Sequence, residues 1–390
     1  MTNSIKTYTL VFTALFLMNG CSNSQEEIPQ ETKKKSAAIS DSKKTPTFSL
    51  NDFLSSSEAL NKQVEELFSE LSNHQRVAQL IMPAIGDYGQ EEATIDKLVR
   101  AQKIGGLLLL NGTKNQFSSW VKKYNDLNDS LQAPRFLYSA DAEPSLINRK
   151  IKNTPDVPKA NTLQTKKEVI ATAQQINNEL LEIGINYNFA PVVDMSPNQT
   201  VGWRSFGHQP DSVIPWSNAF ISTTQSDNII ATAKHFPGHG FVEGDTHKKL
   251  VYIDGKMKEV NNYPPLIKNK VASIMIAHIA IRNNEQYGTE GLPASISTTI
   301  VQDLLRNELG FEGLVVTDAM NMGGVSSIED AAFKAIKAGC DIVLMPLDAS
   351  ATHDRLLEAY ASNDELKPRI EKAVKRILRA KICLGLTAIK

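Results

Sequence analysis

The sequence predicts an α/β protein built as a single (β/α)8 TIM barrel. Short apolar runs alternate with longer amphipathic segments from about Phe53 onward, which is typical of a parallel sheet covered by helices. About eight of these runs have the length and composition of buried strands. Eight strands separated by helices favour a closed barrel over an open doubly wound sheet.

The strand candidates are spread along the chain from about residue 79. In order they are QLIMPAI near 80, GGLLLL near 107, FLYSAD near 138, NFAPVVD near 190, ATAKHF near 233, ASIMIAH near 275, GLVVTDA near 316 and DIVLMP near 343. Helix-like spacers such as KKEVIATAQQINNELLEIG lie between them. The final segment, PRIEKAVKRILRAKICLGL, has apolar residues at helical spacing and Lys and Arg on the other face. We expect it to close the barrel, which leaves no room for a second domain of catalytic size.

The N-terminal region predicts export and membrane attachment. Residues 1–20 carry Lys6, an apolar stretch over 8–18 and small residues before Cys21, which is the layout of a secretory signal. The stretch is too short to span a bilayer. Its junction with Cys21 resembles the lipobox of bacterial lipoproteins, so we expect Cys21 to be lipidated and the chain to be anchored in the cell envelope, on the periplasmic or outer-membrane side. An ordinary signal peptide with an incidental Cys21 is the alternative.

A flexible linker is expected over residues 21–50, because this stretch is rich in Ser, Gln, Glu, Lys and Thr and poor in large apolar residues. The domain would then occupy residues 51–390. Cys340 and Cys383 sit in apolar contexts and are predicted to be buried free thiols. No CxxC or HExxH spacing occurs, so we expect neither a metal site nor a cofactor.

The charge balance argues against a nucleic-acid partner. The formal net charge is -1, and no run of Lys and Arg is long enough for such a surface. The sequence does not determine the oligomeric state, for which a monomer is the default expectation.

Polar residues follow four of the predicted strands. They are Asp141, Asp194, the pair Lys234 and His235, and Asp318. A lone Asp in such a place is often a helix N-cap or a solvated loop carboxylate. In a TIM barrel, however, the C-terminal ends of the strands meet at one rim, where active sites lie, so we interpret the four together as a candidate site.

The segment KHFPGHGFVEGDTH contains three histidines and an aspartate among several glycines and a proline, which forbid a helix and predict a structured loop. A solvated surface loop and a metal loop are the alternatives, although zinc loops more commonly offer Cys or His at helical or knuckle spacing. Asp245, two residues before His247, can hold the imidazole and raise its basicity, leaving the other nitrogen to transfer a proton. Asp318 would be a separate carboxylate nucleophile.

These residues resemble glycoside hydrolase family 3, and within it the bacterial β-N-acetylglucosaminidase branch that acts on peptidoglycan fragments. The resemblance runs from about Leu71 to the C-terminus through IGGLLLLNG, SADAE, INYNFAPVVDM, WRSFG, KHFPGHG with DTH, IMIAHI, LGFEGLVVTDAM and AGCDIVLMP. It implies a retaining reaction with Asp318 as nucleophile, His247 as acid/base and Asp245 as its partner. It also implies sugar contacts in the first subsite from Asp141, Arg149, Arg204, Lys234 and His235, with His239 as loop support.

One motif departs from the family. The pattern DxEGG…R reads DAEPSLINR here, with Pro144 and Ser145 in place of two glycines. Because Pro144 cannot adopt a positive φ, we expect a changed loop shape or specificity more readily than lost activity.

The expected function is release of terminal N-acetylglucosamine from peptidoglycan fragments or chitin-like oligosaccharides. A phosphorylase of the same family stays open, because a neutral histidine repels phosphate less than a carboxylate would. A β-glucosidase or xylosidase of the family usually has a second α/β domain and ranks lower. A glycan-binding lipoprotein with weak or no catalysis is the alternative from another class.

Overall fold

The structure is a computed structural model that describes residues 47–195, 198 and 201–387. The predicted signal peptide, Cys21 and most of the predicted linker lie outside the described residues. Helix α1 (Leu50–Phe53) begins at the last residue of the predicted linker. The described residues form one compact unit. None of the helices within the described ranges is both long and apolar enough to cross a membrane.

Seven strands form one parallel sheet. Their order across the sheet is β12-β10-β8-β7-β5-β3-β2, and every neighbouring pair is parallel. The bounds, in chain order, are β2 (Ala84–Ile85), β3 (Gly106–Leu109), β5 (Leu137–Ala140), β7 (Tyr187–Asn188), β8 (Ile230–Phe236), β10 (Ser273–Ile276) and β12 (Leu314–Thr317).

Two further strands close this sheet into a barrel. The strands β1 (Ile81–Met82) and β13 (Val343–Leu344) pair in parallel, with the Val343 N–H donating to the Leu80 carbonyl at 2.8 Å. On the other side of β13, the Thr317 N–H at the end of β12 donates to the Ile342 carbonyl at 3.1 Å. Since β1 leads directly into β2, the eight predicted segments supply the whole ring, and the predicted (β/α)8 fold is confirmed.

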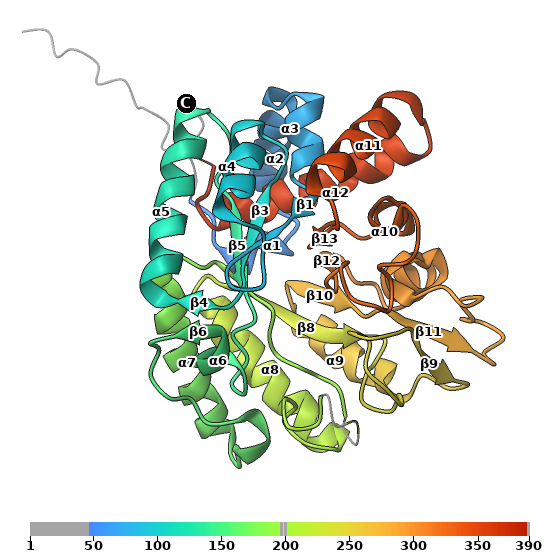
Figure 1. Cartoon of the computed structure of the whole chain (residues 1–390). Helices are drawn as coiled ribbons and strands as arrows, with labels where there is room; N and C mark the ends of the chain where they lie inside the picture. Colours follow the sequence, from blue (N-terminus) through green and yellow to red (C-terminus); the bar gives the residue numbers. More distant parts are fainter. Residues whose placement is uncertain (1–46, 196–197, 199–200, 388–390) are drawn as a thin grey trace, which may run out of the picture. The chain divides into compact units, whose positions relative to one another are not determined.

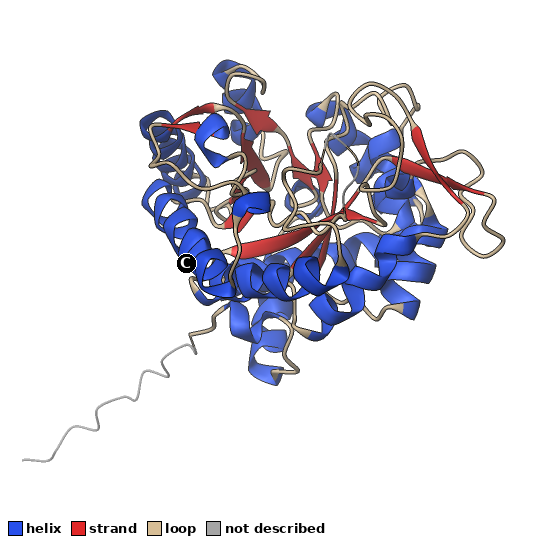
Figure 2. Ribbon diagram, turned by 90° about the horizontal axis from the view of Figure 1, so that it is seen from below, coloured by secondary structure: helices blue, strands red, loops and turns tan. Residues whose placement is uncertain are grey.

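Helices surround the strands, which lie at the centre in Figure 2. Figure 1 shows α5, α7 and α8 on one side of the barrel and α11 and α12 on another. The larger elements are α2 (Glu58–Glu70), α3 (Asn73–Ala78), α4 (Glu92–Arg100), α5 (Lys114–Ser130), α7 (Lys166–Ile183), α8 (Pro210–Ser226), α9 (Tyr263–Lys268), a π-helix over Thr299–Glu308, α10 (Ala331–Ala338), α11 (Ala349–Ser362) and α12 (Leu366–Cys383).

Local sequence explains where the two predicted helices begin and end. Helix α7 starts at a capping box in which Thr165 and Glu168 satisfy each other's backbone N–H groups, and it ends at Gly184, whose φ is 91°. Helix α12 buries one face at helical spacing, including Ile370, Val374 and Ile377. Both confirm the helices expected from the sequence. Cys340 and Cys383 are free and buried, as predicted.

The fourth strand is shorter than its sequence suggested. Regular pairing in β7 ends at Asn188, before the apolar run APVV of the predicted segment. Pro191 has no N–H to donate, so the ladder cannot continue through it. The chain nevertheless stays in the ring, because the Ala190 and Pro191 carbonyls accept from the N–H groups of Thr232 and Lys234 at 2.8 and 3.2 Å.

Two short strand pairs stand outside the ring and were not predicted. One joins β9 (Val251–Asp254) to β11 (Ile279–Arg282), and the other joins β4 (Gly112–Thr113) to β6 (Ile151–Lys152), which directly follows α6 (Ile147–Lys150). The β9 and β11 pair projects from the edge of the molecule in both views (Figures 1 and 2). Both pairs form in segments that follow the C-terminal ends of barrel strands, so they shape the face where the predicted site lies.

Candidate active site

All the residues predicted from the sequence to act in catalysis or sugar binding line one cavity of about 490 Å³. They come from different strand ends and from the loop after β8, and they are Asp141, Arg149, Arg204, Lys234, His235, Asp245, His247 and Asp318. The convergence follows from the fold, because parallel barrel strands bring their C-terminal ends to one rim. Whether each residue touches a substrate stays a prediction.

Asp318 directly follows β12 and is fixed by its neighbours. Its N–H donates to the Ile276 carbonyl of β10 at 2.9 Å, and its Oδ1 accepts from the Ala319 N–H at 2.8 Å. Burial alone would raise the pKa of the Asp318 carboxyl, but the charges of His235 and His278 and the Ala319 N–H outweigh it and lower the pKa. Asp318 is therefore an ionised carboxylate at neutral pH, as a nucleophile must be.

His278 supports the backbone next to Asp318. It follows β10, is fully buried, and places Nε2 3.0 Å from the Ala319 carbonyl and Nδ1 2.7 Å from the Ser295 hydroxyl. Because a carbonyl only accepts, Nε2 carries the hydrogen. His278 lies in the motif IMIAHI and no role was predicted for it, although a polar residue at a strand end is the same signal that marked Asp318.

Asp245 and His247 form the pair that the sequence predicted. Asp245 Oδ1 lies 2.7 Å from His247 Nδ1 and also accepts from the His247 N–H at 3.0 Å. Burial opposes ionisation of Asp245, but the His247 N–H, ring and charge lower the pKa of its carboxyl. An ionised carboxylate only accepts, so His247 donates from Nδ1 and keeps Nε2 for proton transfer. The ring is 62% exposed, so it can reach a leaving group or water.

The loop that carries this pair rests on the loop after β12. The Gly323 and Gly324 N–H groups donate to the carbonyls of His247 and Thr246, each at 3.0 Å. A Cβ at Gly323 would lie 2.4 Å from the Lys248 carbonyl oxygen, so the close approach requires glycine. His239 is buried and places Nε2 3.0 Å from the Thr246 hydroxyl, in agreement with its expected role as loop support.

A buried charge network lines the other side of the cavity. Lys234 Nζ lies 2.8 Å from Asp141 and 2.6 Å from Glu143, and Arg204 binds Glu143 through Nε at 2.8 Å and Nη2 at 2.6 Å. Burial alone would raise the pKa of both carboxyls. The charges of Arg204 and Lys234 instead hold the pKa of Glu143 at about 2, and those of Lys234 and Lys150 hold the pKa of Asp141 well below its usual range.

Glu143 is the residue of this network that sequence reasoning missed. It belongs to the SADAE motif, two residues after Asp141. Nothing in the sequence indicated that this second carboxylate would be buried between two cations. Lys234 is 1% exposed and Asp141 22% exposed, so Asp141 presents its carboxylate to the cavity while Lys234 lies beneath it. The network holds a carboxylate in place where a sugar hydroxyl could donate to it.

His235 is oriented by Asp194, a strand-end carboxylate that the sequence placed in the candidate site but that is buried and does not line the cavity. His235 Nδ1 lies 2.7 Å from Asp194 Oδ2, and Asp194 Oδ1 accepts from the His239 N–H at 2.8 Å. Glu259, in a short 3₁₀ helix over Lys258–Asn262, lies behind them and accepts from the Gly240 N–H at 2.8 Å. Burial, followed by the charge of Asp194, raises the pKa of Glu259 to about 8. These carboxyls fix the start of the loop that carries Asp245 and His247.

The DAEPSLINR departure is accommodated without strain. The N–H groups of Leu146 and Ile147 donate to the Glu143 carbonyl at 2.9 and 3.0 Å, which makes a helical turn that begins at Pro144. Proline is favoured in the first turn of a helix. Ser145 donates to the Trp203 carbonyl at 2.9 Å and so ties this turn to the segment before Arg204. Arg149 lies exposed at the rim of the cavity.

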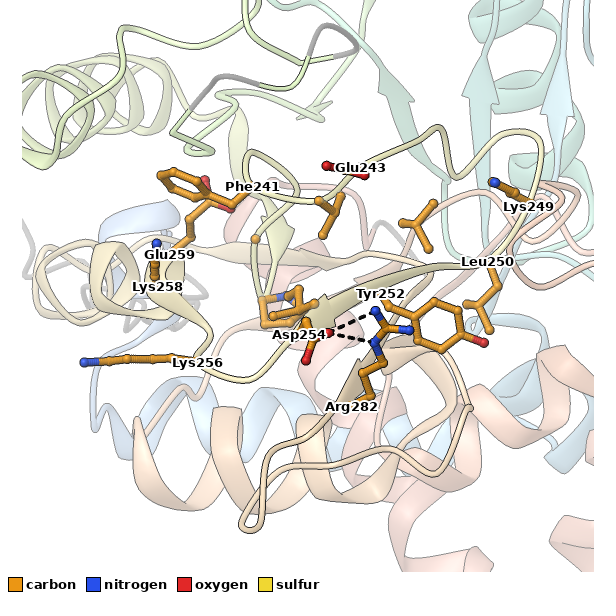
Figure 3. A pocket seen from close by; sticks show the side chains of 15 residues that line it. Phe241, Glu243, Lys249, Leu250, Tyr252, Asp254, Lys256, Lys258, Glu259 and Arg282 are labelled. Carbon is orange, nitrogen blue, oxygen red and sulfur yellow. Dashed lines mark hydrogen bonds and ion pairs between the residues drawn. The ribbon is translucent and has the colours of Figure 1, made fainter.

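A second cleft lies on the other side of the loop that carries Asp245 and His247. Its volume is about 560 Å³, and it runs between that loop and β9 (Figure 3). Figure 3 shows Tyr252 and the ion pair of Arg282 with Asp254 at one end and Phe241 with Glu259 at the other. The cleft contains none of the predicted catalytic residues. Within residues 47–195, 198 and 201–387, no three His, Cys, Asp or Glu side chains gather as they would around a metal ion.

Comparison with known proteins places the chain in a family. Residues 73–380 match the glycosyl hydrolase family 3 N-terminal domain. The chain is 29% identical over 327 residues to β-hexosaminidase A of Pseudoalteromonas piscicida. The matched region covers 74% of this chain but only 54% of that enzyme.

Two solved structures share the fold. A family 3 β-N-acetylglucosaminidase from Paenibacillus sp. str. FPU-7 has a TM-score of 0.73 at 27% identity, over 82% of this chain and 64% of that chain. A β-N-acetylhexosaminidase from Beutenbergia cavernae DSM 12333 has a TM-score of 0.72 at 26% identity, over 80% of this chain and 99% of that chain. The chain therefore belongs to glycosyl hydrolase family 3, through that family's N-terminal domain, and is similar within it to β-hexosaminidases.

Proposed function

We propose that the protein is a retaining exo-β-N-acetylglucosaminidase, which removes terminal N-acetylglucosamine from peptidoglycan fragments or chitin-like oligosaccharides. The observation that carries the proposal is that Asp318 and the His247–Asp245 pair line the same cavity as the Asp141 network. The names of the similar β-hexosaminidases and of the Paenibacillus β-N-acetylglucosaminidase support the choice of sugar.

In the first step, Asp318 attacks the anomeric carbon of the terminal sugar. The carboxylate is ionised and its backbone is fixed on both sides by hydrogen bonds, so it meets the carbon in a set orientation. Protonated His247 gives its Nε2 proton to the leaving oxygen as the glycosidic bond breaks. Asp245 stabilises the imidazolium before transfer and holds the ring at Nδ1.

In the second step, His247 is neutral and acts as base. It takes a proton from water through Nε2 while the water oxygen attacks the glycosyl ester of Asp318, and the sugar leaves with its original anomeric configuration. The carboxylate of Asp141 is available to accept hydrogen bonds from sugar hydroxyls in both steps. Such bonds can strengthen as the ring distorts toward the oxocarbenium-like state.

The proposal is tested by hydrolysis of p-nitrophenyl N-acetyl-β-glucosaminide beside the β-glucoside and β-xyloside. We expect the N-acetyl sugar to be preferred and Asp318→Asn to lose at least a thousandfold in kcat. The matched control is Asp303→Asn, which changes an exposed aspartate on the π-helix and should leave kcat unchanged. Wild-type turnover by Asp318→Asn would refute the assignment of the nucleophile.

The proton-transfer role is tested by the kinetics of Asp245→Asn. The asparagine keeps the shape of the side chain but removes the negative charge beside Nδ1 that stabilises the His247 imidazolium before proton transfer, so kcat should fall about a hundredfold. A variant with wild-type kcat would argue against the pair as acid/base.

The same assay separates the alternatives. Turnover that depends on added phosphate would identify a phosphorylase, and preference for the glucoside or xyloside would identify the other family activities. Binding of N-acetylglucosamine oligomers without any cleavage would favour the glycan-binding protein.

We also propose that Cys21 is lipidated and anchors the protein in the cell envelope. The support is the sequence pattern at residues 1–21 and the linker composition that follows it. Fractionation of cells making the full chain tests this. Cys21→Ser should move the protein out of the membrane fraction, and an unchanged distribution would overturn the anchor.

A further inference from the structure

A shallow groove leaves the catalytic cavity beside the first and last barrel strands. It has a volume of about 150 Å³ and shares Tyr88, Asn321 and Met345 with the catalytic cavity. Tyr88 lies in the loop after β2, Asn321 in the loop after β12 and Met345 directly after β13. The groove is thus continuous with the place where the glycosidic bond would be cleaved.

The two most exposed large apolar side chains of the described residues both line this groove. Tyr88 is 73% exposed and Leu347 is 63% exposed, and no described residue is hydrogen-bonded to the Tyr88 hydroxyl. Single exposed apolar residues are common on protein surfaces. Two exposed apolar residues that flank the same groove, where that groove opens into an active site, indicate a binding surface more specifically. Tyr88 offers an open aromatic face with a free polar tip, which suits a sugar ring with its apolar C–H face and its hydroxyl rim.

The backbone around the groove is already fixed. In the loop that carries Tyr88, the Gln90 N–H donates to the Ala84 carbonyl at 2.7 Å and the Asp87 N–H to the Asn111 carbonyl at 2.7 Å. On the opposite side, the Met345 N–H donates to the Met82 carbonyl at 2.8 Å. A surface that is ordered before binding costs less to occupy than one that must be ordered by its ligand.

The lining of the groove contains no charged side chain. Its polar groups are the amides of Gln90 and Asn321 and the Tyr88 hydroxyl, and the others are apolar or glycine. The catalytic cavity, in contrast, contains several paired charges. Amides and a hydroxyl can bind sugar hydroxyls and acetamido groups, whereas a carboxylate placed here would find no cation to compensate its desolvation.

We propose that this groove is the aglycone subsite and that it takes an uncharged sugar, the second residue of a β-linked N-acetylglucosamine oligosaccharide. The inference rests on the proposed function and narrows it, because it favours chitin-like chains over substrates whose second sugar carries a carboxylate. Tyr88 supplies the stacking face and the two amides bind the rim of the sugar.

The test compares chitobiose cleavage with inhibition by free N-acetylglucosamine, which needs only the first subsite. Tyr88→Ala should lower kcat/KM for chitobiose about tenfold and leave the inhibition constant of free N-acetylglucosamine unchanged. Tyr88→Phe should keep most of the activity because it keeps the aromatic face. The matched control is Tyr252→Ala, which removes an exposed tyrosine from the second cleft (Figure 3) and should have no effect on chitobiose cleavage.

A second comparison tests whether the subsite prefers an uncharged sugar to one that carries a carboxylate. Wild-type protein should cleave chitobiose at least tenfold more efficiently than the disaccharide in which N-acetylmuramic acid replaces the second sugar. Equal cleavage of the two disaccharides, or equal behaviour of Tyr88→Ala and Tyr252→Ala, would overturn the proposed subsite while the proposed function stands. Release of N-acetylglucosamine from none of the substrates would instead overturn the proposed function and the subsite together.

Discussion

Glu143 gives the sharpest quantitative test of how the cavity is held together. Its side chain is fully buried, accepts two hydrogen bonds from Arg204 and forms an ion pair with Lys234 at 2.6 Å. The pKa of about 2, against an ordinary value of 4.5, corresponds to about 3 kcal/mol of stability at neutral pH. In other proteins, removing one partner of a buried ion pair lowers the free energy of unfolding by about 3–5 kcal/mol, which is similar to this value.

We therefore expect Glu143→Gln to lower the free energy of unfolding by about 3 kcal/mol near pH 6, measured by urea denaturation. Because the folded pKa is depressed, this stabilisation is present above pH 4.5 and is lost as the pH falls toward 2, so the gap to wild type should shrink by about half at pH 3. Glu285→Gln, at an exposed position, is the control and should change stability by less than about 0.5 kcal/mol. A Glu143→Gln variant within 1 kcal/mol of wild type at both pH values would show that the ion pairs of Glu143 do not stabilise the fold.

Two further predictions concern the catalytic loop and the core. Gly323→Ala would bring a Cβ within 2.4 Å of the Lys248 carbonyl oxygen and displace the loop that carries His247, so kcat should fall on the order of a hundredfold with circular dichroism unchanged. Ser327→Ala in the same segment is its control, and wild-type kcat in Gly323→Ala would contradict the role of the close approach. Lys381 is fully buried, and burial lowers its pKa to about 7. Between pH 7 and about 10, Lys381 is protonated in the unfolded chain but largely neutral in the folded protein. The free energy of unfolding therefore rises with pH in that window, by up to ~1.4 kcal/mol per pH unit. Lys381→Met should remove that part of the slope in urea titrations, and an unchanged slope would count against it.

The barrel and most of the cavity follow from the sequence pattern alone. The runs LVV in GLVVTDA and IMI in ASIMIAH are apolar because their strands are buried on both faces, and that pattern can be read from the sequence. The residue that follows each run was predicted to reach one rim, and Asp141, Lys234 and Asp318 do line one cavity. The pair of Asp245 and His247 was equally local, since two residues of separation are enough for their contact.

The groups that hold these residues in place are apparent only in the folded chain. Glu143 and His278 act through partners that are distant in sequence, such as Arg204 and Ala319, and a single sequence does not reveal such pairings. The groove likewise combines Tyr88 and Leu347 from loops at opposite ends of the chain, which become neighbours because β1 pairs with β13 when the barrel closes. Strand periodicity predicts what is buried, whereas closure of the ring decides which distant loops meet, and the proposed aglycone subsite exists only through that closure.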